Sequence, residues 1–235
     1  MKKRLQKLMA GKYSTQFSGS IKLRSKEREM WNSVQLFLQR LNSLLMKKLL
    51  TEISQCTICK KHLPFAPRPV LQAGPEARIV IIGQAPGLKV QQSGKPWDDA
   101  SGKKLREWLG VSEEIFYNPN KIALVPMGFC YPGKGTSGDA PPRPECAPQW
   151  HELLLKSMKK VQLIILIGQY SQNYYLGKKA GENLTETVKA LKKYLPEYFV
   201  LPHPSPRNRF WLVKNKWFEK EAVPLLQKKI KALLK

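Results

Sequence analysis

Residues 78–87 read RIVIIGQAPG, an apolar run that ends in a loop bounded by two glycines. The run is rich in β-branched residues, which favours a buried strand. Similar runs follow at residues 122–127, 163–168 and 198–202. Helical patterns occupy residues 101–109, 147–160, 184–194 and 215–234. This alternation predicts an α/β fold, a three-layer α/β/α sandwich around a central, mostly parallel four-stranded sheet.

An unusual loop follows each predicted strand. The four loops begin at residues 83 (GQAPG), 128, 168 (GQY) and 203 (HPSP). Because parallel strands end at one edge of a sheet, we expect these loops to converge there on a ligand. Two nucleotide-binding motifs are excluded. The stretch at residues 128–134 resembles the start of a Walker loop, but Gly135 stands where Ser or Thr must bind magnesium, and the Rossmann glycine pattern is absent.

The chain is strongly basic, with 41 Lys and Arg against 17 Asp and Glu and a formal net charge of +24. Such an excess predicts a polyanionic partner, with a general lysine bias as the alternative. No apolar run approaches the roughly 20 residues that span a bilayer, and the N-terminus does not resemble a secretory leader. We therefore expect a cytoplasmic, nucleoid-associated monomer without membrane contact. Organellar targeting by the basic N-terminus is the alternative.

The composition divides the chain into three parts. Residues 1–26 contain no acid and no apolar period, which predicts a basic disordered extension. Apolar residues recur at helical spacing in residues 27–54, which predicts an amphipathic helix. The alternating strands and helices fill residues 55–235, which we expect to form the functional domain.

Four cysteines form a spaced set. Cys56 and Cys59 make a C-x2-C pair before the first strand, and Cys130 and Cys146 flank the loop after the second. In an intracellular protein such cysteines are ligands more often than disulfides. The spacing suits either an iron–sulfur cluster or tetrahedral zinc.

Four motifs together resemble the uracil-DNA glycosylase superfamily, above all its iron–sulfur branch of the family 4 type. They are GQAPG, then GKPW at residues 94–97, SG at 101–102 and HPS at 203–205. The resemblance extends from Cys56 to about Lys229. It implies hydrolysis of the N-glycosidic bond of uracil, or of another damaged base, in DNA during base-excision repair. It also favours a [4Fe–4S] cluster over zinc as the group bound by the cysteines, in a structural role.

The resemblance also implies how a base would be held. Trp97 falls on the position that stacks on the base, although a core tryptophan is the alternative reading. His203 matches the histidine that donates to the carbonyl oxygen on which negative charge accumulates, and a purely structural histidine is the alternative. The residues expected to bind the base are Gly83, Gln84, Ala85, Pro86, Gly87, Trp97 and His203.

The group that activates water is less clearly marked. The family 4 motif is GEAPG, so Gln84 stands where the family has a carboxylate. Asp98 and Asp99 follow the stacking tryptophan, and a carboxylate there can stabilise a cation-like sugar without forming a bond. We expect Asp99 or Asp98 to act in this way, while Gln84 can still orient water.

The motif that follows His203 combines cations with rigid and aromatic residues. Basic and amide side chains can bind phosphates on either side of an extruded nucleotide, and an apolar side chain can fill the gap in the duplex. By resemblance, Ser205 and the Pro204 carbonyl compress the DNA backbone. The expected phosphate ligands are Arg207, Asn208 and Arg209, and the expected wedge is Pro206 or Phe210.

One departure affects specificity. Family 4 enzymes carry an asparagine at the position of Pro126, so an amide that reads uracil is absent unless Gln84, Gln169 or Asn118 replaces it. Excision of a damaged base is therefore better supported than excision of uracil in particular. The alternative function is a catalytically silent nucleic-acid-binding protein of the same fold, and a zinc-stabilised binding module is the third.

Overall fold

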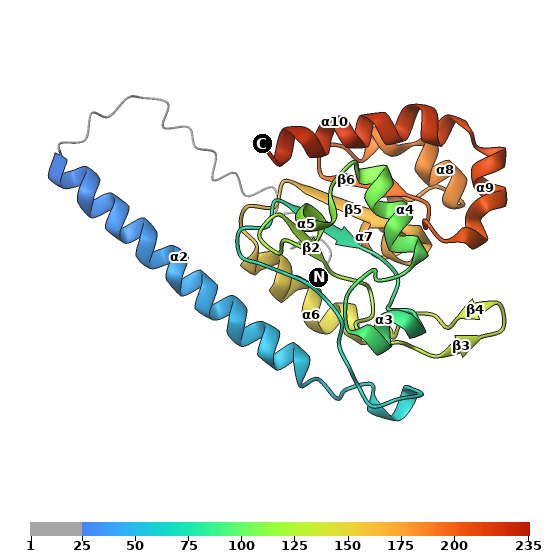
Figure 1. The fold of residues 1–235 in the computed structure, drawn as a ribbon, viewed down its shortest axis with the longest axis horizontal. Coiled ribbons are helices and arrows are strands. Elements are labelled where there is room, and N and C mark those ends of the chain that lie inside the picture. Colours follow the sequence, from blue (N-terminus) through green and yellow to red (C-terminus); the bar gives the residue numbers. More distant parts are fainter. Residues whose placement is uncertain (1–24) are drawn as a thin grey trace. The chain divides into compact units, whose positions relative to one another are not determined.

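The computed structural model describes residues 25–235. Its central element is a sheet of four parallel strands (Figure 1). The strands are β1 (Ile79–Ile82), β2 (Ile122–Leu124), β5 (Leu163–Ile167) and β6 (Tyr198–Leu201). They stand in the order β2-β1-β5-β6. Their side chains are buried almost throughout, as expected where both faces of a parallel sheet are covered. The predicted α/β fold is confirmed.

Helices pack on both sides of the sheet. In Figure 1, α4 and α10 lie together on one side and α6 on the other. The α-helices are α2 (Ser25–Ser54), α3 (Leu88–Ser93), α4 (Ala100–Leu109), α5 (Glu113–Phe116), α6 (Cys146–Ser157), α7 (Gly168–Leu176), α8 (Leu184–Lys189), α9 (Arg209–Lys214) and α10 (Val223–Leu233). Short 3-10 turns are η1 (Lys60–His62), η2 (Gly177–Lys179), η3 (Leu191–Lys193) and η4 (Pro206–Asn208). A small antiparallel hairpin consists of β3 (Lys134–Gly135) and β4 (Gly138–Asp139).

The register brings the strand ends level. Ile82 of β1 pairs with Leu166 of β5, and Leu166 pairs with Val200 of β6. The residues just beyond these pairs therefore leave the sheet along one edge. This edge is where the four unusual loops of the sequence begin.

The structure differs from the helix prediction in three places. The pattern at residues 184–194 contains α8 and the separate 3-10 turn η3. Residues 168–170 were expected to be a loop, but they begin α7, whose buried Gln172 donates from Nε2 to the Leu201 carbonyl at 2.9 Å. The single helix expected at residues 215–234 is interrupted instead. A π-helical turn, η5 (Phe218–Ala222), precedes α10, because Pro224 lacks the N–H that a continuous helix would need.

The last turns of the long helix α2 contribute to the core. The chain divides into two units, residues 1–40 and residues 41–235. In the second unit Met46, Leu49 and Ile53 are buried, while Leu44 is 62% exposed. The boundaries expected at residues 26 and 54 stay predictions. Of the predicted basic extension, residues 1–24 lie outside the described residues. No helix among residues 25–235 is both long and apolar enough to cross a bilayer.

Candidate active site

A cavity of about 460 Å³ opens at the carboxyl edge of the sheet. Every parallel strand supplies part of its wall. Gln84 follows β1, Pro126 follows β2, Tyr170 lies in the first turn of α7 after β5, and His203 follows β6. Pockets that take a small-molecule ligand have volumes of about 300–1,000 Å³, so the cavity has room for a single base.

Trp97 lies on the cavity wall in a strained backbone conformation. Its φ is +57°, in the left-handed region that non-glycine residues rarely adopt. Two glycines make this placement possible: a Cβ on Gly83 would lie 2.7 Å from Trp97 Cζ2, and a Cβ on Gly102 would lie 1.8 Å from the Trp97 carbonyl oxygen. The Tyr117 hydroxyl donates to that same oxygen at 3.4 Å. Strain held in this way is more typical of a functional side chain than of a core tryptophan.

His203 is held as a hydrogen-bond donor toward the cavity. The Ser205 backbone N–H donates to His203 Nδ1 at 3.2 Å, so in the neutral ring the proton is on Nε2. Burial lowers the pKa of His203 below its ordinary value, and the nearby Asp99 carboxylate partly opposes that shift. The ring stacks on Trp97 with centroids 5.6 Å apart. The two side chains proposed to handle the base are thus neighbours.

Of the two acids expected beside Trp97, Asp99 lines the cavity and Asp98 is not among its lining residues. The Asp99 carboxylate is the N-cap of α4, where Oδ1 accepts a hydrogen bond from the Gly102 N–H at 2.8 Å. This bond fixes the start of α4 directly after the strained Trp97. One oxygen of the Asp99 carboxylate is therefore already used in a structural hydrogen bond.

A second acid in the cavity wall was not predicted from the sequence. Asp139, on β4, lines the cavity together with His203 and Gln84. The sequence signal for it is an aspartate in the glycine-rich loop after the second strand, one of the four loops expected at the carboxyl edge.

The GQAPG loop contributes all five of its residues to the cavity wall: Gly83, Gln84, Ala85, Pro86 and Gly87. Part of its main chain is already bonded, since the Met127 N–H donates to the Gly83 carbonyl and the Gly128 N–H to the Gln84 carbonyl. The Gln84 side chain donates from Nε2 to the Ala140 carbonyl at 3.4 Å.

The end of β2 carries no side-chain amide, because Pro126 follows the strand there. Pro126 lines the cavity, and its carbonyl is bonded to Nε2 of the buried His151 at 3.0 Å. Of the three amides considered as replacements, Gln84 lines the cavity, whereas Gln169 and Asn118 are not among its lining residues.

Part of the motif after His203 faces inward. Ser205, Arg207 and Asn208 line the cavity. Asn208 Nδ2 donates to the His203 carbonyl at 2.8 Å, so this amide holds the loop rather than projecting from it. Arg207 reaches across to the hairpin, where Nη1 donates to the Ser137 carbonyl at 3.4 Å.

The remaining motif residues differ in exposure. Pro204 is buried, whereas Pro206 and Arg209 are exposed. Phe210 is 71% exposed and lies against the Arg209 guanidinium, with 5.5 Å from Cζ to the ring centroid. An exposed aromatic side chain is available to a partner.

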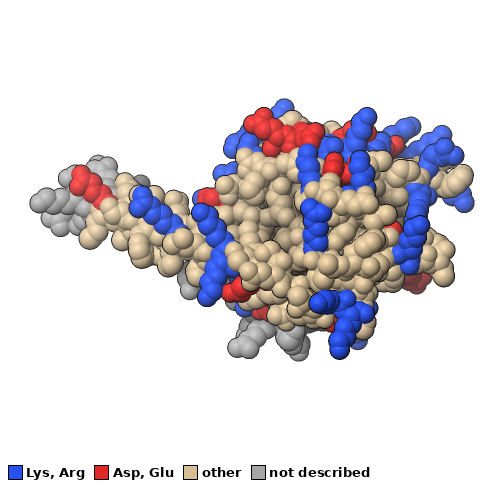
Figure 2. Space-filling model, turned by 60° about the horizontal axis from the view of Figure 1, so that its bottom comes forward, with Lys and Arg blue, Asp and Glu red and all other residues tan. Residues whose placement is uncertain are grey.

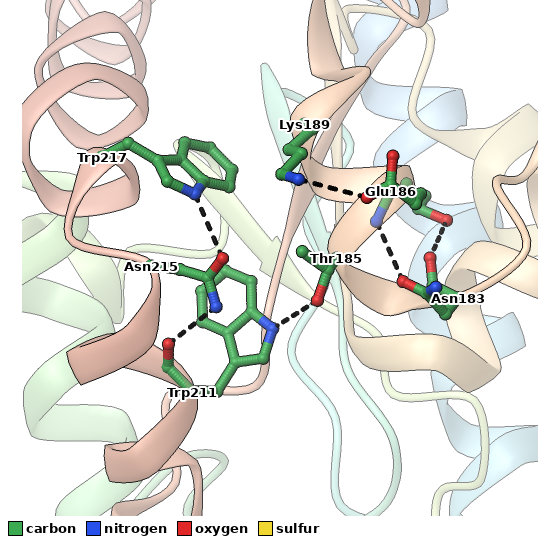
Figure 3. Close-up of polar contacts among 8 residues, drawn as sticks. Asn183, Thr185, Glu186, Lys189, Trp211, Asn215 and Trp217 are labelled. Carbon is green, nitrogen blue, oxygen red and sulfur yellow. Dashed lines mark hydrogen bonds and ion pairs between the residues drawn. The ribbon is translucent and has the colours of Figure 1, made fainter.

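The helix that follows the motif, α9, is joined to α8 by one hydrogen bond, and two more lie within residues 211–217 (Figure 3). Trp211 Nε1 donates to Thr185 Oγ1 at 2.8 Å, and Asn215 Nδ2 donates to the Trp211 carbonyl at 2.8 Å. Trp217 Nε1 donates to Asn215 Oδ1 at 3.1 Å. These tryptophans therefore serve the packing of α9, which anchors the far end of the loop that carries His203.

On the face that Figure 2 presents, the positive charge is spread out rather than concentrated. Figure 2 shows Lys and Arg side chains standing apart from one another over the face that it presents, with acidic side chains among some of them. Dispersed cations give long-range attraction to a polyanion without sequence specificity.

The four cysteines line one small, mostly apolar cavity together with Arg143. Burial raises the pKa of Cys130 to about 11 and that of Cys146 to about 12, so free thiols there would stay protonated at neutral pH. The Phe129 N–H donates to Cys146 Sγ at 3.4 Å. A backbone donor and a guanidinium in the same cavity as the four cysteines suit thiolates that bind a metal group. Within residues 25–235 no three His, Cys, Asp or Glu side chains are grouped closely enough to hold a single ion.

Comparisons with known proteins agree on one family. The model of the family described as the uracil DNA glycosylase superfamily matches residues 71–227. The type-4 uracil-DNA glycosylase of Sulfurisphaera tokodaii is 27% identical over 155 residues, which are 65% of this chain and 68% of the relative. The enzyme of the same name from Thermotoga maritima is 26% identical over 143 residues, 58% of this chain and 69% of the relative.

Gly102→Ala tests the strained placement of Trp97. Alanine inside a helix usually stabilises a protein by about 1 kcal/mol relative to glycine. Here the added Cβ would lie 1.8 Å from the Trp97 carbonyl oxygen, so we expect a net loss of about 1–3 kcal/mol, measured by urea denaturation. Gly135→Ala is the matched control, since its Cβ would meet nothing closer than 3.4 Å. A Gly102→Ala protein as stable as wild type would contradict this account.

Proposed function

Because the chain belongs to the uracil-DNA glycosylase superfamily, we propose that it is a DNA glycosylase that removes uracil or another damaged base. The observation that carries the proposal is the pairing of Trp97 with His203 in a base-sized cavity at the carboxyl edge of the sheet. A glycosylase needs an aromatic surface for the extruded base and a donor for the charge that the base acquires on leaving. Both lie in this cavity.

Capture of the base is the first step. Extruding a nucleotide from duplex DNA costs a few kcal/mol. Stacking on an aromatic side chain returns about 1–3 kcal/mol per base, and we assign this role to Trp97. The walls of the cavity from Gly83 to Gly87 enclose the base, and Gln84 is the side-chain amide placed to contact its edge.

Departure of the base is the second step. As the glycosidic bond breaks, its electron pair moves onto the base and negative charge collects on a carbonyl oxygen. The Nε2–H of neutral His203 donates to that oxygen. Since the Ser205 N–H fixes the tautomer, the donor is aimed before the reaction begins, and preorganised donors of this kind are effective. Asp99 lies near the imidazole and keeps its pKa from falling further.

DNA binding uses the rim of the cavity. We assign phosphate contacts to Arg207 and Arg209 and the wedge to Phe210, which is 71% exposed. Asn208, Ser205 and Pro204 instead shape the loop from within. We further propose that one copy of the chain acts alone on DNA in the cytoplasm, because a single chain supplies every wall of the cavity.

We propose that Cys56, Cys59, Cys130 and Cys146 hold a [4Fe–4S] cluster, with zinc as the alternative. When bound, such a group crosslinks distant segments and contributes its binding energy to folding. Cys56 and Cys59 follow α2 and precede the sheet, while Cys130 and Cys146 enclose the loop that carries the β3–β4 hairpin. The group would therefore tie the N-terminal segment to the base of this loop.

Excision from defined oligonucleotides tests the function. We expect wild-type protein to release the base and leave an abasic site in duplex DNA containing uracil or a deaminated purine. In His203→Ala, the single-turnover rate should fall about 10²–10³-fold while DNA affinity stays nearly the same. Trp97→Ala should weaken capture of the extruded base as well. His62→Ala, an exposed histidine outside the cavity, is the control. Wild-type protein that binds DNA but releases no base would favour the silent binding protein.

On the acid side of the pH profile, the excision rate should follow the protonation of His203. Burial lowers its pKa, so the neutral donor persists below the ordinary value of about 6.5, and the rate should stay level from about pH 8 to pH 6.5. Below the folded pKa the rate should fall, because protonation of Nδ1 breaks the bond from Ser205. Asp99→Asn removes a charge that favours imidazolium, so the limb should move to lower pH in single-turnover measurements. A limb that moves to higher pH would exclude this role for Asp99.

Chemical analysis tests the cofactor. Protein purified without oxygen should be brown, absorb broadly in the visible range and contain iron and sulfide. Cys130→Ser should lower the iron content and the unfolding temperature, because one ligand is lost and the loop it anchors is freed. Stoichiometric zinc with neither iron nor sulfide would replace the cluster with the alternative.

A further inference from the structure

Asp139 occupies a position in the cavity that none of the assigned roles uses. The sequence contains three aspartates, at positions 98, 99 and 139. Asp139 belongs to β4, far in sequence from Trp97, yet it lines the same cavity as Trp97, His203 and Gln84. A Cβ added to Gly87 would lie 3.4 Å from Asp139 Oδ2. The carboxylate is therefore beside the GQAPG loop.

The Asp139 carboxylate makes no contact among the described residues that stabilises the fold through a hydrogen bond or an ion pair. Asp99 Oδ1 is the N-cap acceptor of α4, and Asp98 is not among the residues that line the cavity. Among the described residues, no hydrogen bond or ion pair is formed by the Asp139 side chain. An exposed, unpaired carboxylate in the wall of a cavity has its oxygens free to accept hydrogen bonds and to attract positive charge.

The hairpin that carries Asp139 is held in place from both sides of the cavity. At its base the Ala140 N–H donates to the Gly133 carbonyl at 2.8 Å. Gln84 donates to the Ala140 carbonyl from the GQAPG loop, and Arg207 donates to the Ser137 carbonyl from the His203 loop. Catalytic side chains need such positioning, because small displacements cost large factors in rate.

We propose that Asp139 is a catalytic residue, the carboxylate that orients the attacking water and stabilises the positive sugar. The proposal rests on the proposed glycosylase function. The C1′–N bond breaks and its electron pair leaves with the base, while the water oxygen forms the new C1′–O bond. The proton released by that water passes to the Asp139 carboxylate and from there to solvent. His203 faces the leaving base and Asp139 faces the sugar.

The other polar side chains suit this role less well. Gln84 is a neutral amide, so it cannot take the proton, and its Nε2 is engaged with the Ala140 carbonyl. The Asp99 carboxylate is bound to the Gly102 N–H and lies near His203, the proposed donor to the base. Asp139 is thus the carboxylate available to the sugar.

Asp139→Asn keeps the size of the side chain and removes its charge. We expect the single-turnover excision rate to fall about 10²–10³-fold, while affinity for undamaged duplex stays equal or rises slightly. Glu114→Gln is the matched control, because it removes one negative charge from an exposed carboxylate on α5, outside the cavity. An Asp139→Asn protein that excises the base at the wild-type rate overturns the proposal.

A second test moves the carboxylate from position 139 to position 84. Residue 84 touches the residue next to Asp139, so a carboxylate at position 84 enters the cavity close to the one that was removed. The double variant Gln84→Glu, Asp139→Asn should recover at least about tenfold of the lost rate. A double variant no faster than Asp139→Asn would mean that position 139 acts through its contacts rather than its charge, which also overturns the proposal.

Binding to abasic-site analogues separates this proposal from the function itself. One duplex carries a protonated pyrrolidine in place of the sugar, and the other carries neutral tetrahydrofuran. Wild-type protein and Glu114→Gln should prefer the cationic analogue, and Asp139→Asn should lose about five- to tenfold of that preference. An unchanged preference in Asp139→Asn overturns the role of Asp139. If wild-type protein excises no base but the preference behaves as expected, the glycosylase function fails while the cation-binding role of Asp139 stands.

Discussion

Four parallel strands in level register impose the constraint on which the site depends. Their side chains are apolar and buried on both faces, so the sheet itself has no room for polar groups that lack partners. Polar and titratable side chains that act on a ligand must therefore lie beyond the ends of the strands. Gln84, Pro126 and His203 each follow a strand directly, and their distances from one another are therefore set by strand spacing rather than by loop flexibility.

The cavity at this edge contains two groups of different charge, a neutral imidazole and a carboxylate. His203 is kept neutral by burial and is aimed by the Ser205 N–H, which suits a donor to a developing anion. Asp139 is exposed and unpaired, which suits attraction of a developing cation. A glycosidic bond that breaks heterolytically creates one charge of each sign. A neutral donor on one side and a carboxylate on the other can stabilise both without an ion pair between them that would cancel the effect.

The sequence predicted the features that depend on local pattern. The β-branched runs located all four strands, and the loop motifs located His203 and Trp97 at the edge. Features that depend on tertiary contact were not predictable in the same way. Helix α7 has little apolar periodicity and is held by the buried Gln172. The left-handed backbone of Trp97 is visible only once Gly83 and Gly102 are packed against it, and Asp139 reaches the cavity only through a hairpin.

The β3–β4 hairpin connects the cysteine site with the cavity of the candidate active site. It lies in the loop between Cys130 and Cys146, which is long and rich in proline and glycine and would be costly to order alone. Thiolate ligation at both ends would remove most of this freedom. The remaining contacts, from Gln84 and Arg207, would then need only to orient the tip. A metal group that takes no part in the reaction would thereby decide how accurately the Asp139 carboxylate is placed, while the sheet and His203 would be held independently of it.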